Sequence, residues 1–310
     1  MKLYDAAVIG EGPAGITAAL YLARSGCSVI LFEQLTAGGQ ILQTEGLENY
    51  PGFPHGIKGY ELADLFSEHL NDLEIARPRG EVSSVSGKAG DFVIKAAANE
   101  DAYRARTVLV CSGAKHRQLG VEHETHYIGR GVSYCAICDG NFYRNQTVAV
   151  VGGGNAALEE SLYLAKIAAK VILIHRRAEF RGAMVYQEKL MALGEKVEIL
   201  RDTIVTSLVG DKLLEGLVIR NLVTNLEQTI SVDGLFIYVG FEPVTAFLPV
   251  ELQKDGQGFI ITDTEMRTNI PGIFAAGDIR SKLCRQVITA AGDGATAAQA
   301  AFVFMEQLHA

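Results

Sequence analysis

The stretch Val8-Ile9-Gly10-Glu11-Gly12-Pro13-Ala14-Gly15 decides the fold, because a short apolar run leads directly into closely spaced glycines. A helical segment is expected at 16–24 and a second apolar strand at 29–31. Glycine at the first position permits a tight turn, glycine at the second lets a pyrophosphate approach the backbone, and a small third residue lets helix pack on strand. We therefore expect a dinucleotide-binding strand-helix-strand unit, with the Glu11 side chain pointing away from the pyrophosphate.

The same unit occurs again 142 residues further along the chain. Residues 7–33 align with residues 149–175 without a gap, and 12 of the 27 positions are identical. The second copy carries the turn Gly152-Gly153-Gly154-Asn155-Ala156-Ala157 after an apolar run at 148–151. One such turn also arises for packing reasons alone, but two in an ungapped repeat favour two nucleotide sites.

The two copies differ at the residue that follows their second strand, which lies beside the adenosine ribose. In the first copy this residue is Glu33, whose carboxylate accepts hydrogen bonds from ribose hydroxyls and repels a 2′-phosphate, so FAD or NAD is expected. In the second copy it is His175, followed by Arg176, Arg177 and Arg181. Guanidinium groups bind a dianionic phosphate, which favours NADPH over NADH, although a solvated basic turn is the alternative.

Composition bounds the class of protein. The chain has 310 residues, 48% of them apolar, with 28 basic and 36 acidic side chains and a formal charge of −8. This length suggests two domains, and a net negative charge without a block of Lys or Arg argues against a nucleic-acid partner. The sequence shows neither an uncharged apolar run long enough for a membrane span nor an apolar signal peptide at its start. We therefore expect a cytoplasmic protein without a membrane anchor.

The segment Cys135-Ala136-Ile137-Cys138-Asp139-Gly140 needs its own explanation. The other cysteines, Cys27, Cys111 and Cys284, are scattered and no histidine pair has ligand spacing, so no metal site is expected. An inert buried pair is one alternative, but this spacing near a strand-helix unit favours a reversible disulfide. Asp139 is a candidate general acid, the alternative being a simple turn residue.

These motifs together resemble those of the low-molecular-weight, bacterial-type thioredoxin reductases over essentially the whole chain. Further matching segments are Gly38-Gly39-Gln40, Asn49-Tyr50-Pro51-Gly52, Gly129-Arg130-Gly131-Val132-Ser133, Phe274-Ala275-Ala276-Gly277-Asp278 and Arg285-Gln286. The resemblance implies an α/β fold of two Rossmann-like dinucleotide-binding domains, each a three-layer ββα arrangement. It implies an FAD domain at 1–114 and 245–310, and an inserted NADPH domain at 115–244 that carries the redox-active cysteines.

The resemblance also implies which residues bind each cofactor. For FAD they are Gly10, Gly12, Pro13, Ala14, Gly15, Glu33, Gln34, Gly39, Gln40, Asn49, Val82, Gly113, Gly277, Asp278, Arg285, Gln286 and Val287. Asp278 is expected to hydrogen-bond the flavin ribitol. For NADPH they are Gly152, Gly154, Asn155, Ala156, Ala157, Glu159, His175, Arg176, Arg177 and Arg181.

The activity implied is electron transfer from NADPH through FAD to the Cys135–Cys138 disulfide, and from there to thioredoxin or a thioredoxin-like protein, in a homodimer. Cys138 would face the flavin, Cys135 would attack the partner disulfide, and Asp139 would move the proton. Because the NADPH site and the cysteines share one domain, we expect a hinge rotation that presents them to the flavin in turn. Alternatives are the reductase of a glutaredoxin-like protein or a peroxidase system, a dithiol oxidase, a ferredoxin-linked relative, and a non-catalytic nucleotide-sensing flavoprotein.

Overall fold

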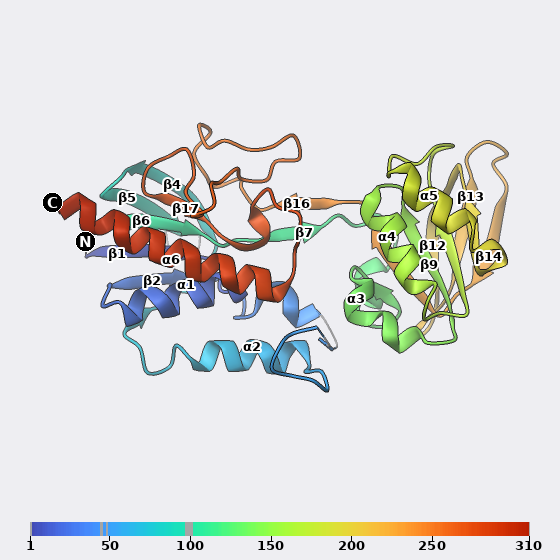
Figure 1. Cartoon of the computed structure of the whole chain (residues 1–310), viewed down its shortest axis with the longest axis horizontal. Coiled ribbons are helices and arrows are strands. Elements are labelled where there is room, and N and C mark those ends of the chain that lie inside the picture. Colours follow the sequence, from blue (N-terminus) through green and yellow to red (C-terminus); the bar gives the residue numbers. More distant parts are fainter. Residues whose placement is uncertain (1, 44–45, 48, 97–101, 310) are drawn as a thin grey trace. The chain divides into compact units, whose positions relative to one another are not determined.

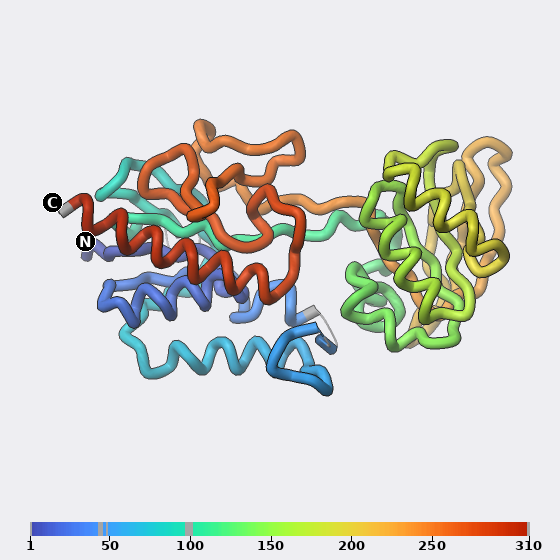
Figure 2. Tube along the Cα trace, viewed as in Figure 1, coloured from blue at the N-terminus to red at the C-terminus, as the bar shows by residue number. Residues whose placement is uncertain are grey.

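The computed structural model describes residues 2–43, 46–47, 49–96 and 102–309, and it divides into two compact units. Unit 1 comprises Met1–Leu42, Tyr50–Lys115 and Glu242–Ala310, and unit 2 comprises Gln43–Asn49 and His116–Phe241. Figure 2 follows the chain as it leaves unit 1 after residue 115 and returns at residue 242. At these crossings β7 (Ala114–His116) and β16 (Phe241–Pro243) pair with each other.

The described residues of the segment 43–49 (43, 46, 47 and 49), which were expected in the first domain, group with unit 2. Gly46 approaches the ring of Phe142 so closely that a Cβ atom there would lie 3.3 Å from Cζ. This approach is one physical reason for the grouping.

Unit 1 is built on one sheet with the strand order β3-β2-β1-β6-β5-β4 and with β17 beside β6. The pairs β1–β2, β1–β6, β2–β3 and β6–β17 are parallel, whereas β4–β5 and β5–β6 are antiparallel. The strands are β1 (Leu3–Ile9), β2 (Val29–Phe32), β3 (Ile75–Ala76), β4 (Val82–Lys88), β5 (Asp91–Ala96), β6 (Ala102–Val110) and β17 (Ile273–Ala275). The helices are α1 (Pro13–Arg24), α2 (Gly59–Glu68) and α6 (Val287–His309).

Side chains on strand β1 point alternately to the two faces of the sheet, so that the sheet has an apolar core on each side and unit 1 has three layers. Ala6 and Val8 belong to the apolar core shared with α1 and α6, which run side by side along the sheet (Figure 1). Ala7 and Ile9 point to the opposite face and join a second core with the β4–β5 hairpin. Successive side chains on a strand face opposite ways, so one strand serves both cores.

Helix α6 is long and apolar enough, by length and composition alone, to cross a membrane. In unit 1, however, it packs against α1, and its Ala297, Ala298 and Ala301 side chains are buried in the helix-side core. This is the usual behaviour of a core helix in a globular domain.

Unit 2 contains a five-stranded parallel sheet of order β11-β10-β9-β15-β8 and a three-stranded antiparallel sheet of order β12-β13-β14. The strands are β8 (Val132–Ser133), β9 (Thr147–Gly152), β10 (Lys170–Ile174), β11 (Val197–Leu200), β12 (Thr203–Gly210), β13 (Leu214–Asn221), β14 (Glu227–Ser231) and β15 (Gly234–Tyr238). The helices are α3 (Ala136–Asp139), α4 (Asn155–Leu164) and α5 (Met184–Met191). Apolar side chains fill both faces of the parallel sheet, on one side with α4 and α5 and on the other with the antiparallel sheet.

The predicted repeat is confirmed element by element. The order β1, α1, β2 in unit 1 corresponds to β9, α4, β10 in unit 2, and the two strands of each copy are parallel neighbours. The predicted α/β class, with two dinucleotide-binding folds of similar layering, is therefore confirmed.

Candidate active site

The first glycine turn has the geometry of a phosphate cradle. Gly10 has φ +105°, and a Cβ atom there would collide with the carbonyl oxygen of Cys111. A Cβ atom on Gly15 would collide with the carbonyl oxygen of Gly10, whereas at Gly12 the nearest atom would be 4.0 Å away. Since α1 begins directly after Gly12 without a side-chain cap, its first N–H groups border this open space. The turn therefore fits a pyrophosphate.

Glu33 is held rigidly at the carboxyl end of β2. Its Oε2 accepts a hydrogen bond from the Glu11 backbone N–H at 2.9 Å, and its Oε1 accepts one from the Leu35 N–H at 2.9 Å. Each carboxylate oxygen has a second lone pair, so the group can still accept hydrogen bonds from ribose hydroxyls. This geometry fits the adenosine end of FAD.

The Glu11 side chain is buried, only 1% exposed, and its carboxylate forms ion pairs with two arginines. Arg77 Nη2 bonds Oε1 directly and also donates to Ser67 Oγ at 3.0 Å, while Arg79 Nη1 lies 3.1 Å from Oε2. The negative charge beside the turn is thus compensated within the protein. Neither arginine could be recognised from the sequence, because a separation of 66 and 68 residues from Glu11 leaves no local pattern.

Most residues predicted to bind FAD gather at the carboxyl ends of neighbouring parallel strands, where open α/β sheets bind nucleotides. Glu33 follows β2, Gly113 follows β6, and Gly277 with Asp278 follows β17. Gly39 approaches the turn, since a Cβ atom there would lie 3.3 Å from Gly12 Cα. The others in unit 1 are Gly10, Gly12, Pro13, Ala14 and Gly15 around the turn, Gln34, Gln40, Val82 at the start of β4, and Arg285, Gln286 and Val287 at the start of α6. Asn49 falls in unit 2.

Asp293 on α6, which was not among the predicted site residues, anchors the Gly277–Asp278 segment. Its Oδ2 accepts a hydrogen bond from the Gly277 N–H at 3.1 Å and lies 3.1 Å from Lys282 Nζ. Its Oδ1 lies 2.9 Å from Arg280 Nη1. Burial raises the pKa of Asp278, while the Lys282 ammonium opposes that rise. The Asp293 contacts thus hold Asp278 at the carboxyl end of β17, where the ribitol chain of the flavin is expected.

The second glycine turn reproduces the cradle in unit 2. At Gly154 a Cβ atom would meet no atom within 4 Å, and α4 begins directly after it without a side-chain cap. The Arg181 and Gly182 N–H groups donate to the Gly153 carbonyl oxygen at 2.8 and 3.0 Å. This pairing holds the arginine-bearing segment next to the turn, so the residues present fit a phosphorylated dinucleotide.

A cavity of about 350 Å³ lies at the carboxyl ends of β9, β10 and β15. Four residues predicted to bind NADPH line it: Gly152, His175, Arg176 and Arg181. The other predicted residues, Gly154, Asn155, Ala156, Ala157, Glu159 and Arg177, are not among its lining residues. The lining also includes Arg117, which follows directly after β7. Sequence reasoning missed Arg117, because a single arginine in a connecting segment carries no motif.

His175 contributes to this site as a neutral ring. The side chain is 6% exposed, its Nε2 lies 3.0 Å from the Glu179 carbonyl oxygen, and the ring stacks on Phe180. Burial lowers its pKa, and the positive charges of Arg177, Arg181 and Arg176 lower it further, although the hydrogen bond to Glu179 opposes them. The positive charge expected to meet a 2′-phosphate therefore resides on the arginines.

Cys135 and Cys138 form a disulfide at the amino end of α3, as predicted. Cys138 is buried, 7% exposed, whereas Cys135 is partly exposed. Ser133 connects the pair to Asp139: its hydroxyl donates to Asp139 Oδ2 at 2.6 Å and accepts from the Cys135 N–H at 3.1 Å. The carboxyl group of Asp139 is therefore connected through the Ser133 hydroxyl to the backbone of Cys135.

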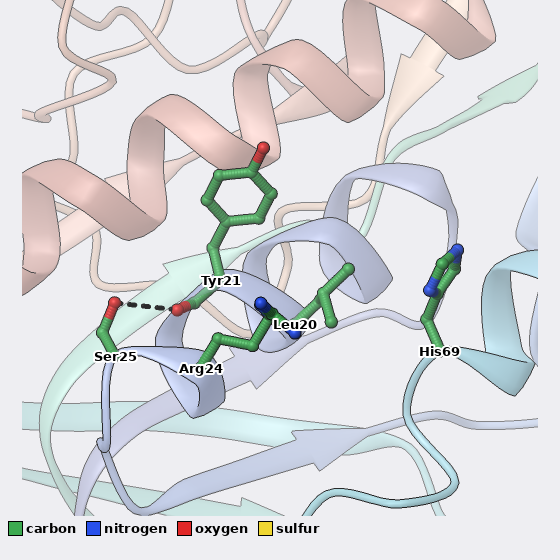
Figure 3. Close-up of a pocket in the computed structure, with 5 residues that line it drawn as sticks. All are labelled: Leu20, Tyr21, Arg24, Ser25 and His69. Atoms are coloured by element: carbon green, nitrogen blue, oxygen red, sulfur yellow. Dashed lines mark hydrogen bonds between the residues drawn. The ribbon is translucent and has the colours of Figure 1, made fainter.

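Figure 3 shows a different hollow, lined by Leu20, Tyr21, Arg24, Ser25 and His69. It surrounds the last turns of α1, and Ser25 Oγ donates to the Tyr21 carbonyl oxygen at 3.0 Å. The glycine turn lies at the opposite end of that helix. None of the predicted site residues lines this hollow, so it is separate from the candidate nucleotide site.

Comparison with known proteins agrees with this geometry. The family model of the pyridine nucleotide-disulphide oxidoreductases matches residues 4–294, and the chain belongs to this family. Thioredoxin reductase from Listeria monocytogenes is 43% identical over 310 residues, which cover 99% of this chain and 95% of the relative. Thioredoxin reductase from Streptococcus pyogenes has a solved structure that is 43% identical, with a TM-score of 0.90 and coverage of 98% and 99%. That from Giardia duodenalis is 32% identical, with a TM-score of 0.90 and coverage of 99% and 100%.

The comparisons and the site together define the enzyme. It is an NADPH-dependent, FAD-containing disulfide oxidoreductase of the thioredoxin reductase type. The Cys135–Cys138 disulfide is its redox-active centre.

Proposed function

We propose that this enzyme passes electrons from NADPH to the disulfide of thioredoxin or a closely related small protein. The observation that carries the proposal is the Cys135–Cys138 disulfide held beside Asp139 at the start of α3. The names of the relatives support thioredoxin as the substrate. The partly exposed Ile137 and Phe142 side chains next to the disulfide offer apolar contact for such a protein.

FAD is assigned to residues 1–114 and 245–310, and NADPH to residues 115–244. The cradle at Gly12 and the fixed Glu33 carboxylate support the first assignment. The cavity with Arg176, Arg181 and Arg117 supports the second. When bound, the two cofactors supply the hydride chemistry.

The cysteines and Asp139 carry out thiol-disulfide exchange. The Cys135 thiolate attacks one sulfur of the partner disulfide, the partner S–S bond breaks, and Asp139 donates a proton to the sulfur that leaves. The Cys138 thiolate then attacks Cys135 Sγ, which releases the second partner sulfur to take its proton from water and re-forms the Cys135–Cys138 disulfide. The partner gains the two electrons that the enzyme pair loses. The greater exposure of Cys135 supports its role as the attacking thiol.

Three further features complete the proposal. The enzyme acts as a homodimer, and a hinge rotation at the β7 and β16 crossings presents the nicotinamide and the disulfide to the flavin in turn. A covalent clamp between the domains should therefore stop turnover. The enzyme works in the cytoplasm, because a dithiol reductase needs a reducing compartment.

The test is NADPH-dependent reduction of thioredoxin by the purified flavoprotein, compared with NADH and with Cys135→Ser. We expect activity with NADPH, little with NADH, and none in the variant, whose flavin should still bleach when NADPH is added anaerobically. A colourless protein that cannot be reconstituted with FAD would contradict the proposal. Equal rates with NADH would overturn the role of Arg176 and Arg181.

A further inference from the structure

Helix α4 presents a carboxyl group to α3, the redox helix, which contains Cys138 and directly follows Cys135. The end of α3 (Ala136–Asp139) packs against α4 (Figure 1), and a Cβ atom on Gly140 would lie 3.2 Å from both Leu164 Cδ2 and Tyr163 Cε1. Glu160 precedes these two residues by four and three positions, so it lies on the same face of α4. Glu160 therefore faces the helix that carries the disulfide.

Tyr238, at the end of β15, contacts the same redox helix. Its hydroxyl oxygen accepts a hydrogen bond from the Ala136 N–H at 2.6 Å. Ala136 directly follows Cys135, so this bond ties down the first residue of α3. Because the Tyr238 oxygen acts as the acceptor here, its own proton is available to a neighbouring acceptor.

A buried acceptor is present in the same region. Glu160 Oε2 is shielded from solvent and has no hydrogen-bond partner among the residues that the structure describes. Burial, and then the Glu160 and Asp139 carboxylates, raise the pKa of Tyr238, while the Ala136 bond lowers it. All these groups belong to unit 2. Tyr238 thus lies within the electrostatic reach of both carboxyl groups.

Glu160 also exchanges its proton in the physiological range. Burial and the neighbouring Glu159 carboxylate raise its pKa to about 7. Its titratable neighbours are Glu159 on α4 and Tyr238 on β15. Tyr238 in turn interacts with Asp139 on α3, and on α5 Tyr186 is hydrogen-bonded to Glu159. Glu160 thus has a pKa near neutral pH and lies on the helix that packs against the redox helix.

We propose that Glu160 and Tyr238 are positioning residues that set the acidity of the Cys135–Cys138 dithiol. Tyr238 fixes the amino end of α3, and an ionised Glu160 on the helix packed against α3 disfavours a second negative charge on the cysteine pair. When a thiolate forms, Glu160 retains its proton or takes one from water. The proposal deepens the proposed function, because it concerns the same dithiol and names what tunes it.

The experiment measures the rate of iodoacetamide alkylation of the reduced, FAD-loaded enzyme as a function of pH. Glu160→Gln keeps the shape of the side chain and removes the charge, so the thiol inflection should move to lower pH and the rate near neutral pH should rise about threefold or more. Glu188→Gln, an exposed change on α5, is the matched control and should leave the profile unchanged. Flavin content and the thermal midpoint confirm folding of each variant.

A second variant tests whether the two residues act together. In a Tyr238→Phe background, Glu160→Gln should shift the profile by much less than in the parent enzyme, because the Glu160 charge acts fully on the cysteine pair only while Tyr238 holds the amino end of α3 in place. A Glu160→Gln profile that matches the parent, or full additivity of the two changes, would overturn the proposal. Alkylation involves no thioredoxin, so this test is independent of the proposed substrate. If the profile shifts as expected but the enzyme does not reduce thioredoxin, the proposed substrate is refuted and the role of Glu160 and Tyr238 is supported.

Discussion

The two glycine turns of this chain share their glycine spacing and differ in the local backbone and in the side chains around it. In unit 1 the third small residue is Gly15, where any Cβ atom would collide with the Gly10 carbonyl oxygen. In unit 2 the same position holds Ala157. A Cβ atom on Gly152 would lie 2.6 Å from the Ala157 Cβ, so glycine at position 152 leaves room for the alanine side chain. The strand ends differ as well, with a hydrogen-bonded carboxylate at Glu33 and a buried neutral ring at His175. The cradle is thus common, and the surrounding side chains decide which nucleotide fits.

The largest difference between the two turns is expected when the third small residue, Gly15 or Ala157, is replaced by the other type. Gly15→Ala places a methyl group against the Gly10 carbonyl oxygen, so we expect loss of bound FAD and of most soluble protein. The matched change in unit 2, Ala157→Gly, adds no clash and should cost only about 1 kcal/mol of stability. The flavin-to-protein ratio of the purified variants measures the difference. A Gly15→Ala enzyme with full flavin content would show that the two turns are equivalent.

Removing the arginines should affect only the second turn. In an Arg176→Ala, Arg181→Ala variant, kcat/KM for NADPH should fall about 100-fold while that for NADH stays nearly constant, because each charge-assisted hydrogen bond contributes about 1.5–3 kcal/mol. Lys189→Ala removes a charge from the exposed side of α5 and serves as the control. Steady-state kinetics with both coenzymes provide the measurement. An equal loss with NADPH and NADH would mean that the arginines do not recognise the phosphate.

Glu11 distinguishes the first turn, since unit 2 has Gly153 at the same place. Glu11→Ala leaves Arg77 and Arg79 without their partner, but their side chains are 25% and 54% exposed. Water therefore screens part of the loss, and we expect unfolding in urea to be easier by about 1–2 kcal/mol. The additional change Arg79→Ala should recover part of this loss. Unchanged stability in Glu11→Ala would show that the ion pairs contribute nothing.

The smallest effect concerns His175 and pH. Burial holds its pKa below the ordinary 6.5, so the unfolded chain binds a proton more readily than the folded protein as the pH falls through that value. The folded protein should therefore lose stability between about pH 7.5 and about pH 5.5, and His175→Gln should lose less, by under about 1 kcal/mol. Thermal unfolding at the two pH values tests this, with His55→Gln as the exposed control in unit 1. An identical pH dependence in His175→Gln would exclude the buried ring as its source.

Much of the architecture could be predicted because its determinants are local. The glycine spacing, the alternation of apolar residues and the repeat with an offset of 142 residues all lie within short windows, and the structure reproduces both strand-helix-strand units. The C-x-x-C pair is also a local signal, and it forms the expected disulfide. The segment 43–49 was expected in the first domain because it lies within that stretch of sequence, but its described residues, 43, 46, 47 and 49, group with unit 2.

The sequence by itself determined the fold class, the duplicated cradle and the redox pair, because steric limits on the backbone and side-chain periodicity act between near neighbours. Only the tertiary structure decided how charges are paired and tuned. It brought Arg77 and Arg79 to Glu11, Asp293 to Gly277, and Tyr238 to the redox helix. These contacts join segments far apart in the chain, and burial changes a side chain's protonation only once the surrounding core has formed.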